Sequence, residues 1–319
     1  MSMRELPIIG PKSYTKAWWN KRNKTIGASE AAAIMGMSRW SMPYDVYKKK
    51  TFTAGSEYSN ASREKAFRRG HALEEFVLNE YHLLVGGSIR YPVPMLIHPK
   101  YDFMSATPDA LWTDVLIKNR PISLQAILSK PYIPVDAKTA ARGEGWGEEG
   151  TEEIPQEYII QAQQQMAETG ASRCDIAVMI DGTNYDVRLY PVLRNEDIIE
   201  SMISAEHEFM ERVRDKNPPS PDWTHPKAYD IVRQVGGVTG EAIDMSDEAS
   251  EMWKEIEELS KKKSEIESAI KTRRAKVLFE MGEAGIGSLP DGRRLVRKVI
   301  KRQAKEIAAC EYVKLSCQK

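Results

Sequence analysis

Two short stretches of sequence decide the fold expected for this chain, SATPDA at residues 105–110 and VDAK at residues 135–138. Each stretch lies at the end of an apolar run and contains an aspartate, Asp109 in the first and Asp136 in the second. We therefore expect two strands, each ending on a carboxylate. Asp136 and Lys138 are two residues apart, so on a strand both side chains point to the same face. Ala137 between them points the other way, which leaves its backbone carbonyl available as a ligand.

These residue types are typical of metal-assisted cleavage of phosphodiesters. Hard divalent cations such as Mg²⁺ prefer oxygen ligands and keep several waters, so two or three carboxylates are enough to form a site. A neighbouring lysine can orient the attacking water and neutralise charge that develops on a phosphate. The DAK tripeptide alone is weak evidence, because two solvated charges at a strand edge would give the same letters. The surrounding sequence has to decide between these two interpretations.

The composition is that of a globular protein with room for a full core: 319 residues, 41% hydrophobic and 29% charged. The 46 basic and 46 acidic side chains cancel, so net charge does not indicate a polyanionic partner. No apolar run approaches the roughly 20 residues of a membrane helix, and residues 1–7 lack the pattern of a secretion signal. Cys174, Cys310 and Cys317 have neither zinc spacing nor a disulfide framework. We expect a cytoplasmic protein without a membrane partner.

Apolar periodicity, capping residues and turn signals predict the order helix, three strands, helix, two strands in the first two thirds of the chain. Ser29 is expected to cap the second helix. This order predicts an α/β (α+β) fold in which helices flank a mixed central sheet. The expected helices span residues 14–21, 29–35, 61–84, 155–168 and 196–214, and the expected strands span 88–98, 103–112, 132–138, 174–180 and 185–192, the last two joined by a turn at 181–184.

Three regions are expected: a first domain at 1–216, a Pro-rich linker or strap at 217–245, and a C-terminal extension at 246–319. The extension begins with a charged helix over 246–281 whose apolar residues recur at threes, fours and sevens. This segment either packs on the body, as one amphipathic helix or as a helical hairpin, or mediates self-association. A hairpin follows around Pro290-Asp291-Gly292, with a basic ribbon that either follows a DNA backbone or forms a solvated tail. The basic residues are Arg293, Arg294, Arg297, Lys298, Lys301 and Arg302.

Several further residues stand near the first two motifs in the expected order of elements. Glu74 lies in the long third helix, and Tyr158, Gln161 and Gln163 lie on the helix that follows the DAK strand. Each of these, like Trp18, Arg22 and Ser29 near the N-terminus, has an ordinary structural role when taken singly: a surface carboxylate, a satisfied polar side chain, a core aromatic or a helix cap.

Together and in this order, the motifs IGAS (26–29), GHALE (70–74), PD (108–109), DAK (136–138) and QAQ (161–163) resemble those of one family. It comprises the phage lambda-type exonucleases, also called the YqaJ-type viral recombinases, of the restriction-endonuclease-like superfamily with the PD-(D/E)xK motif. The resemblance runs from about residue 18 to residue 214. It implies a restriction-endonuclease-like core with a mixed central sheet.

The resemblance also implies roles for individual residues. Asp109 and Asp136 match the metal ligands, the carbonyl of Ala137 completes the inner shell, and Glu74 matches a glutamate that binds metal directly or through water. The expected cofactor is Mg²⁺, with Mn²⁺ as a substitute. Lys138 matches the lysine that positions the nucleophilic water.

The remaining matches concern the substrate. Tyr158, Gln161 and Gln163 match the motif that lines the active site. Arg22, Ser29 and Thr107 fall where these enzymes bind the 5′-terminal phosphate or the nearby strand. An arginine beside a hydroxyl is a sound phosphate receptor. The chain departs from lambda exonuclease in having Asp136 for a glutamate and Thr107 for a serine. The segment between the two aspartates is also longer, and the C-terminal third has no counterpart.

The resemblance therefore implies a Mg²⁺-dependent 5′-to-3′ exonuclease that acts on double-stranded DNA ends in a bacterial host cell. It further implies a homotrimer that hands the exposed 3′ strand to a single-strand annealing protein. A non-catalytic DNA-end-binding or scaffold protein and an endonuclease of the same superfamily remain open. An iron–sulfur nuclease is disfavoured, because it needs four cysteine ligands and this chain has three.

Overall fold

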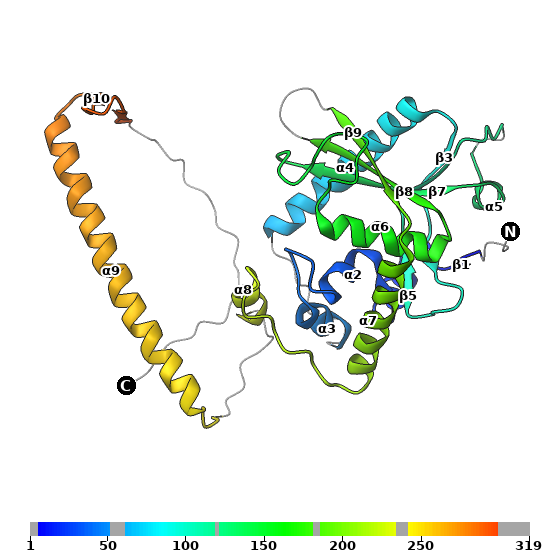
Figure 1. Cartoon of the computed structure of the whole chain (residues 1–319), viewed down its shortest axis with the longest axis horizontal. Helices are drawn as coiled ribbons and strands as arrows, with labels where there is room; N and C mark the ends of the chain where they lie inside the picture. Colours follow the sequence, from blue (N-terminus) through cyan, green and yellow to red (C-terminus); the bar gives the residue numbers. More distant parts are fainter. Residues whose placement is uncertain (1–5, 52–60, 119–120, 181–185, 234–241, 299–319) are drawn as a thin grey trace. The chain divides into compact units, whose positions relative to one another are not determined.

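A computed structural model describes residues 6–51, 61–118, 121–180, 186–233 and 242–298 of the chain. The chain divides into two compact units, Met1–Gly236 and Gly237–Lys319, which are described separately below (Figure 1). Among the described residues no helix is long and apolar enough to cross a membrane.

The first unit is built on a five-stranded sheet in the order β3-β6-β7-β8-β9. Strands β7 and β8 pair in parallel, and the other neighbours are antiparallel, so the sheet is mixed as expected. The two central strands are each eight residues long. The strands span Ser88–Arg90 (β3), Ala110–Thr113 (β6), Ile133–Ala140 (β7), Arg173–Ile180 (β8) and Val187–Leu193 (β9).

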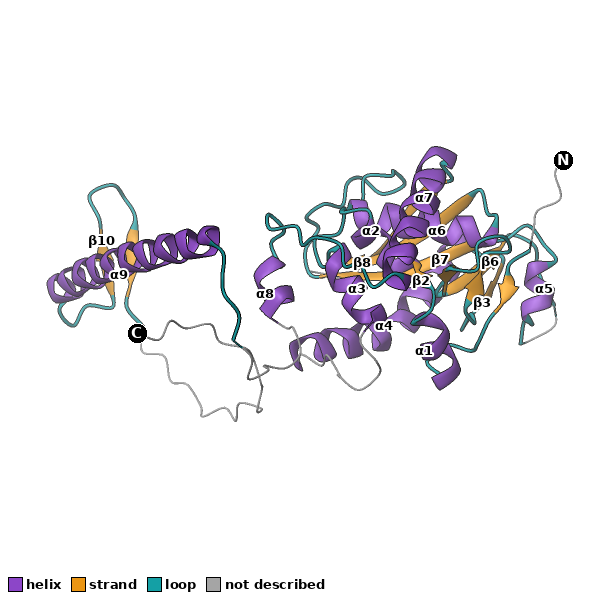
Figure 2. Cartoon of the chain, turned by 90° about the horizontal axis from the view of Figure 1, so that it is seen from below, coloured by secondary structure: helices purple, strands orange, loops and turns teal. Residues whose placement is uncertain are grey.

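Two helices bury the opposite faces of this sheet (Figure 2). On one face, Val77, Leu78 and Tyr81 of α4 (Ala61–Val85) pack against Val135 of β7. On the other face, Met166 of α6 (Gln156–Thr169) lies in a cluster with apolar side chains of β8 and β9. Side chains alternate between the two faces along a strand, so Asp136 and Lys138 of β7 face α6.

A second, smaller sheet has the order β1-β4-β5-β2 and packs with the remaining helices beside α6. Helix α2 contacts α6 and α7, and α7 also contacts α3 (Figure 1). The core of this layer is apolar, with Ala31, Ala32, Met104 and Met202 buried together. The elements are β1 (Ile8–Ile9), α1 (Lys16–Arg22), β2 (Ile26–Gly27), α2 (Ala28–Ile34), α3 (Pro43–Thr51), β4 (Leu96–Ile97), β5 (Met104–Ala106), α5 (Leu124–Leu128) and α7 (Glu196–Arg214).

The expected order of helices and strands is confirmed, and the helix over 196–214 has the expected bounds. Two expected strands are each divided between the two sheets. The strand predicted over 88–98 becomes β3 and β4, and the strand predicted over 103–112 becomes β5 and β6. Prolines separate the halves, at 92 and 94 in the first case and at 108 in the second, and a proline donates no hydrogen bond to a sheet. The turn predicted at 181–184 lies outside the described residues.

Two further expectations are corrected. Ser29 does not cap α2: the cap is Gly27, whose backbone N–H donates to Glu30, and Ser29 lies in the first turn. The linker predicted over 217–245 contains helix α8 (Ala228–Arg233), so the first unit extends beyond residue 216. Ala228 and Ile231 of α8 are buried against Met42, which explains why this segment belongs to the first unit.

The second unit consists of α9 (Asp247–Met281) and a two-stranded antiparallel ribbon of β10 (Ile286–Ser288) and β11 (Arg294–Val296). Ser246 caps α9, since its hydroxyl accepts a hydrogen bond from the Ala249 backbone N–H. The predicted helix over 246–281 and a hairpin around Pro290 are therefore both present. Lys301 and Arg302 of the predicted basic ribbon lie outside the described residues.

Candidate active site

Strand register brings the two aspartates together. Ala110 of β6 pairs with Val135 of β7 in an antiparallel ladder, so Asp109, one residue before Ala110, lies opposite Asp136. A carboxylate oxygen of Asp109 accepts a hydrogen bond of 2.8 Å from the backbone N–H of Ala137, which fixes the side chain across the strand pair. Two distant sequence motifs thus form one acidic pair.

Lys138 points to the same side of β7 as Asp136. Its ammonium group forms an ion pair with the Asp136 carboxylate and lies 5.4 Å from the centre of the Tyr158 ring. Tyr158 is itself stacked on Trp146, with ring centroids 5.5 Å apart. An aromatic wall therefore confines the lysine beside the acidic pair.

Two glutamines of α6 complete the surroundings of Asp136. The side-chain amide of Gln161 donates to both carboxylate oxygens at 3.2 and 3.1 Å, and that of Gln165 donates to one of them at 3.0 Å. Gln165 was missed in the sequence, although it lies one helical turn after Gln161 and hence on the same face. Asp136 is 2% exposed and receives all three of these hydrogen bonds.

Gln163, expected to line the site, does not join this group. Its amide donates to the Leu193 carbonyl at 2.7 Å, and its side-chain oxygen accepts from the Asn195 backbone N–H at 2.9 Å. A residue two positions after Gln161 lies on the opposite side of a helix, and here that side faces the end of β9. The expectation for Gln163 is therefore corrected: it ties α6 to β9.

The acidic pair is electrostatically unfavourable without a cation. Removal from water and the neighbouring Asp136 carboxylate raise the pKa of Asp109 well above its ordinary value. Burial alone would lower the pKa of Lys138, but the carboxylates of Asp136 and Asp109 outweigh it and raise that pKa. The site therefore holds its lysine charged and its two carboxylates under mutual repulsion.

This donor set fits a hard divalent cation. Two carboxylates and the carbonyl of Ala137 supply oxygen only, and a bound cation would relieve the repulsion between Asp109 and Asp136. Among the described residues no three histidine, cysteine or acidic side chains form a ready-made metal cluster. Glu74 lines the same cavity, but it does not make a three-carboxylate cluster with the aspartates.

The acidic pair opens into a cavity of about 1470 Å³. Ten of the eleven site residues proposed from the sequence line this cavity, and Gln163 is the exception. The ten are Arg22, Ser29, Glu74, Thr107, Asp109, Asp136, Ala137, Lys138, Tyr158 and Gln161.

A second polar group lies in this cavity, centred on Arg22. Its guanidinium donates to the Ser29 hydroxyl at 2.8 Å and lies 5.2 Å from the Trp18 ring centre. The Trp18 indole N–H donates to the Thr107 hydroxyl at 3.2 Å. A methyl group at Gly27 would lie 2.5 Å from one guanidinium nitrogen of Arg22. A larger residue at this position would therefore displace the guanidinium from its present place.

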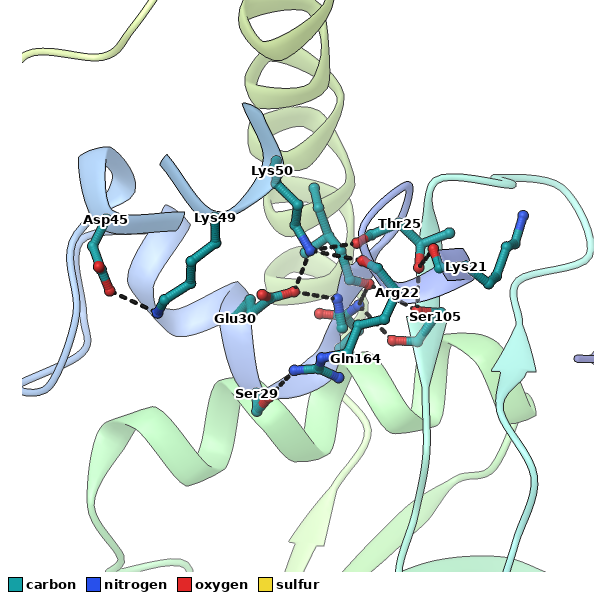
Figure 3. A network of polar contacts seen from close by, with 12 residues as sticks. Lys21, Arg22, Thr25, Ser29, Glu30, Asp45, Lys49, Lys50, Ser105 and Gln164 are labelled. Atoms are coloured by element: carbon teal, nitrogen blue, oxygen red, sulfur yellow. Dashed lines mark hydrogen bonds and ion pairs between the residues drawn. The ribbon is translucent and has the colours of Figure 1, made fainter. Parts of the chain in front are cut away.

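A buried ion pair supports the loop between Arg22 and Ser29 (Figure 3). The Lys50 ammonium donates to the carbonyls of Arg22 and Thr25 at 2.9 and 2.7 Å and to the Glu30 carboxylate at 2.8 Å. The Lys50 and Glu30 side chains are 2% and 13% exposed. Burial alone would raise the pKa of Glu30, but Lys50 and Arg22 lower it to about 2. Sequence reasoning identified neither member of this pair.

An aspartate pair and a lysine on neighbouring strands of a mixed sheet, flanked by helices, place the first unit in the restriction-endonuclease-like class. Residues 17–172 match the YqaJ-like viral recombinase domain, the family that the motifs of this chain resemble.

Individual known proteins are similar to larger parts of the chain. The uncharacterized protein YqaJ of Bacillus subtilis (strain 168) is 25% identical over 274 residues, which span 85% of this chain and 79% of that protein. The crystal structure of an alkaline exonuclease from Laribacter hongkongensis is 21% identical, with a TM-score of 0.48, and covers 64% of this chain and 94% of its own. The crystal structure of a phage-related exonuclease from Haemophilus somnus 129PT is 12% identical, with a TM-score of 0.41. The match covers 60% of this chain and 96% of that structure.

Proposed function

We propose that this protein is a Mg²⁺-dependent exonuclease that digests one strand of double-stranded DNA from its 5′ end during viral-type recombination. One observation carries the proposal: the acidic pair with its lysine and the Arg22–Ser29 pair line a single cavity. The first group suits hydrolysis of a phosphodiester and the second suits binding of a phosphate. The match of residues 17–172 to the YqaJ-like viral recombinase domain supports the same activity.

The residues around the acidic pair would have separate roles in hydrolysis. Asp109, Asp136 and the Ala137 carbonyl would hold the metal ion, with Glu74 reaching it through water. When bound, the ion supplies Lewis acidity and lowers the pKa of a coordinated water. The Lys138 ammonium, held beside Asp136 and against Tyr158, orients the attacking water and faces the charge that develops on the phosphate.

The Arg22–Ser29 pair in the same cavity would bind the 5′ end of the DNA strand. A guanidinium donates two parallel hydrogen bonds to a phosphate, and the Ser29 and Thr107 hydroxyls add further contacts. Arg22 is held by Ser29 and by the Trp18 ring, so its side chain is already ordered in the free protein. A terminal 5′-phosphate placed there would set the direction of digestion.

Two partners follow from the same family resemblance. We propose that the first units of three copies surround the DNA as a ring and retain the undigested strand. The exposed 3′ strand would then pass to a single-strand annealing protein. Both partners rest on the family alone.

The test is digestion of linear duplex DNA with Mg²⁺, with Mn²⁺ and with EDTA, using a separate label on each strand and either a phosphate or a hydroxyl at the 5′ ends. We expect metal-dependent loss of the 5′-phosphorylated strand, and loss of activity in Lys138→Met with DNA binding retained. Equal digestion of 5′-phosphorylated and 5′-hydroxyl strands would refute the phosphate site but not the metal site. Cleavage of closed circular DNA would favour an endonuclease of the same superfamily. Binding without digestion under every condition would favour the DNA-end-binding protein.

A further inference from the structure

Helix α9 carries an apolar seam that its own unit does not cover. The helix has 35 residues, about five seven-residue repeats, and no buried residue. The large apolar side chains of the seam are between 39% (Val277) and 63% (Leu259) exposed. Alternating spacings of three and four residues define the seam positions, which are Ala249, Met252, Ile256, Leu259, Lys263, Ile266, Ile270, Arg273, Val277 and Glu280. A seam sustained over this many repeats is the pattern of a coiled coil.

Three residues of the seam are charged, Lys263, Arg273 and Glu280. They discriminate between a parallel and an antiparallel arrangement of copies of α9. In a parallel pair or a parallel trimer in register, each seam residue meets its own counterpart, so each of these charges would face a like charge. An antiparallel pair with its two-fold axis between residues 264 and 265 removes all three clashes. In that register Lys263 lies opposite the partner's Ile266, Arg273 opposite the partner's Ile256, and Glu280 opposite the partner's Ala249. The other layers are apolar, since Ile270 lies opposite the partner's Leu259 and Val277 opposite the partner's Met252.

The residues that flank the seam agree with the same register. Glu255 comes beside the partner's Lys276, and this contact occurs twice because the pair is symmetric. Trp253 comes beside the partner's Arg274, an arrangement suited to a cation–π contact. Glu255 and Lys276 are about 32 Å apart along one helix, so they cannot contact each other within one chain. A parallel pair would place Ser260 beside Glu255 instead.

We propose that two copies of this chain associate through an antiparallel α9–α9 coiled coil with this register. The observations that carry the proposal are the exposed seam, the placement of its charges and the complementary flanking residues. A two-fold contact of this kind is separate from any ring that the first units form, because it uses a different part of the chain. Sedimentation velocity of the full chain without DNA measures it independently of nuclease activity.

The test compares Glu255→Lys, Lys276→Glu, the double variant and the control Glu258→Lys, which makes the same charge change away from the seam. Each single variant replaces two attractive contacts by two repulsive ones, and we expect it to weaken association about tenfold. The double variant restores the opposite charges and should associate like the unchanged chain. An equimolar mixture of the two single variants should also associate, because each then supplies the charge that the other needs. The control should associate normally.

The equimolar mixture of Glu255→Lys and Lys276→Glu is the most specific part of the test. Recovery on mixing requires contact between residue 255 of one copy and residue 276 of another, which only the antiparallel arrangement provides. If the single variants associate as tightly as the unchanged chain, or if neither the double variant nor the mixture recovers, the proposed pairing is wrong. An unchanged chain that shows no concentration-dependent association attributable to α9 would overturn the proposal equally.

Discussion

Replacement of Lys50 by methionine should strongly destabilise the first unit. Methionine keeps most of the length and apolar volume of the lysine but removes the ammonium group that donates to Arg22, Thr25 and Glu30. The Glu30 carboxylate then remains largely enclosed, and the Arg22 guanidinium is the cation that still lowers its pKa. Loss of one partner of a buried ion pair typically costs about 3–5 kcal/mol, because the other charge stays behind without compensation.

The pKa of Glu30 gives a second estimate of this cost. Its folded value of about 2 lies about 2.5 units below its ordinary value of 4.5. At about 1.4 kcal/mol per unit, the charged form of Glu30 contributes about 3–4 kcal/mol at neutral pH. Because folding lowers the pKa of Glu30, its charged form stabilises the fold at pH values above its pKa in the unfolded chain. This stabilisation is lost as the pH falls from about 4.5 towards 2. The difference in the free energy of unfolding between the unchanged chain and Lys50→Met should therefore be largest near pH 7 and shrink below pH 4.5.

Urea unfolding at pH 7, followed by tryptophan fluorescence, measures the effect. We expect Lys50→Met to lower the free energy of unfolding by about 3 kcal/mol. The matched control is Lys50→Met combined with Glu30→Gln, which removes both charges and should recover part of the loss. If Lys50→Met costs less than about 1 kcal/mol, or the double variant is no more stable than the single one, the buried ion pair does not stabilise this loop.

Three further predictions concern single side chains. Gly27→Ala should displace the Arg22 guanidinium, since the added methyl would lie 2.5 Å from it; we expect a drop of about tenfold in the preference for 5′-phosphorylated over 5′-hydroxyl DNA ends. Gln165→Leu removes a hydrogen bond to the Asp136 carboxylate and should lower turnover about 10- to 100-fold, whereas Gln163→Leu should reduce thermal stability more than turnover. Burial and the neighbouring Glu168 raise the pKa of Glu206, so the folded chain keeps a proton that the unfolded chain loses above about pH 4.5. Stability should fall as the pH rises above that value, and Glu206→Gln should therefore raise the urea midpoint at pH 8 and change it little at pH 5.

The helices and strands could be predicted because they follow from local periodicity, whereas the acidic pair was predicted because its motifs resemble those of a known family. Asp136 and Lys138 share a face by simple alternation, and α7 (196–214) shows its apolar stripe and its Asn195 cap in the sequence. Strand ends were harder to predict. The prolines at 92, 94 and 108 move the chain from one sheet to the other, and alternation alone does not show such a change.

The supporting residues of the cavity were not predicted from the sequence, for two different reasons. Gln165 could have been found by helical periodicity, because it lies one turn after Gln161. Gln163, two residues after Gln161, lies on the opposite side of α6 and contacts Asn195 instead. Lys50 and Glu30 lie 20 residues apart on different helices, α3 and α2, and no repeat connects them. Their pairing depends on how α2 and α3 pack together, which is a tertiary property.

The two ends of the cavity therefore rest on different supports. The Asp109–Asp136 pair is fixed by backbone hydrogen bonds between β6 and β7 and by the Ala137 N–H, so its geometry follows from the sheet itself. The Arg22–Ser29 pair depends on a loop that side chains hold, chiefly the Lys50 ammonium. Loosening that loop should relax the proposed selection of 5′-phosphate ends before it affects hydrolysis. Under conditions where Lys50→Met remains folded, we thus expect 5′-phosphorylated and 5′-hydroxyl ends to be digested at similar rates, with the 5′-hydroxyl rate close to that of the unchanged chain. An equal fall in both rates would show instead that the two ends of the cavity share one support.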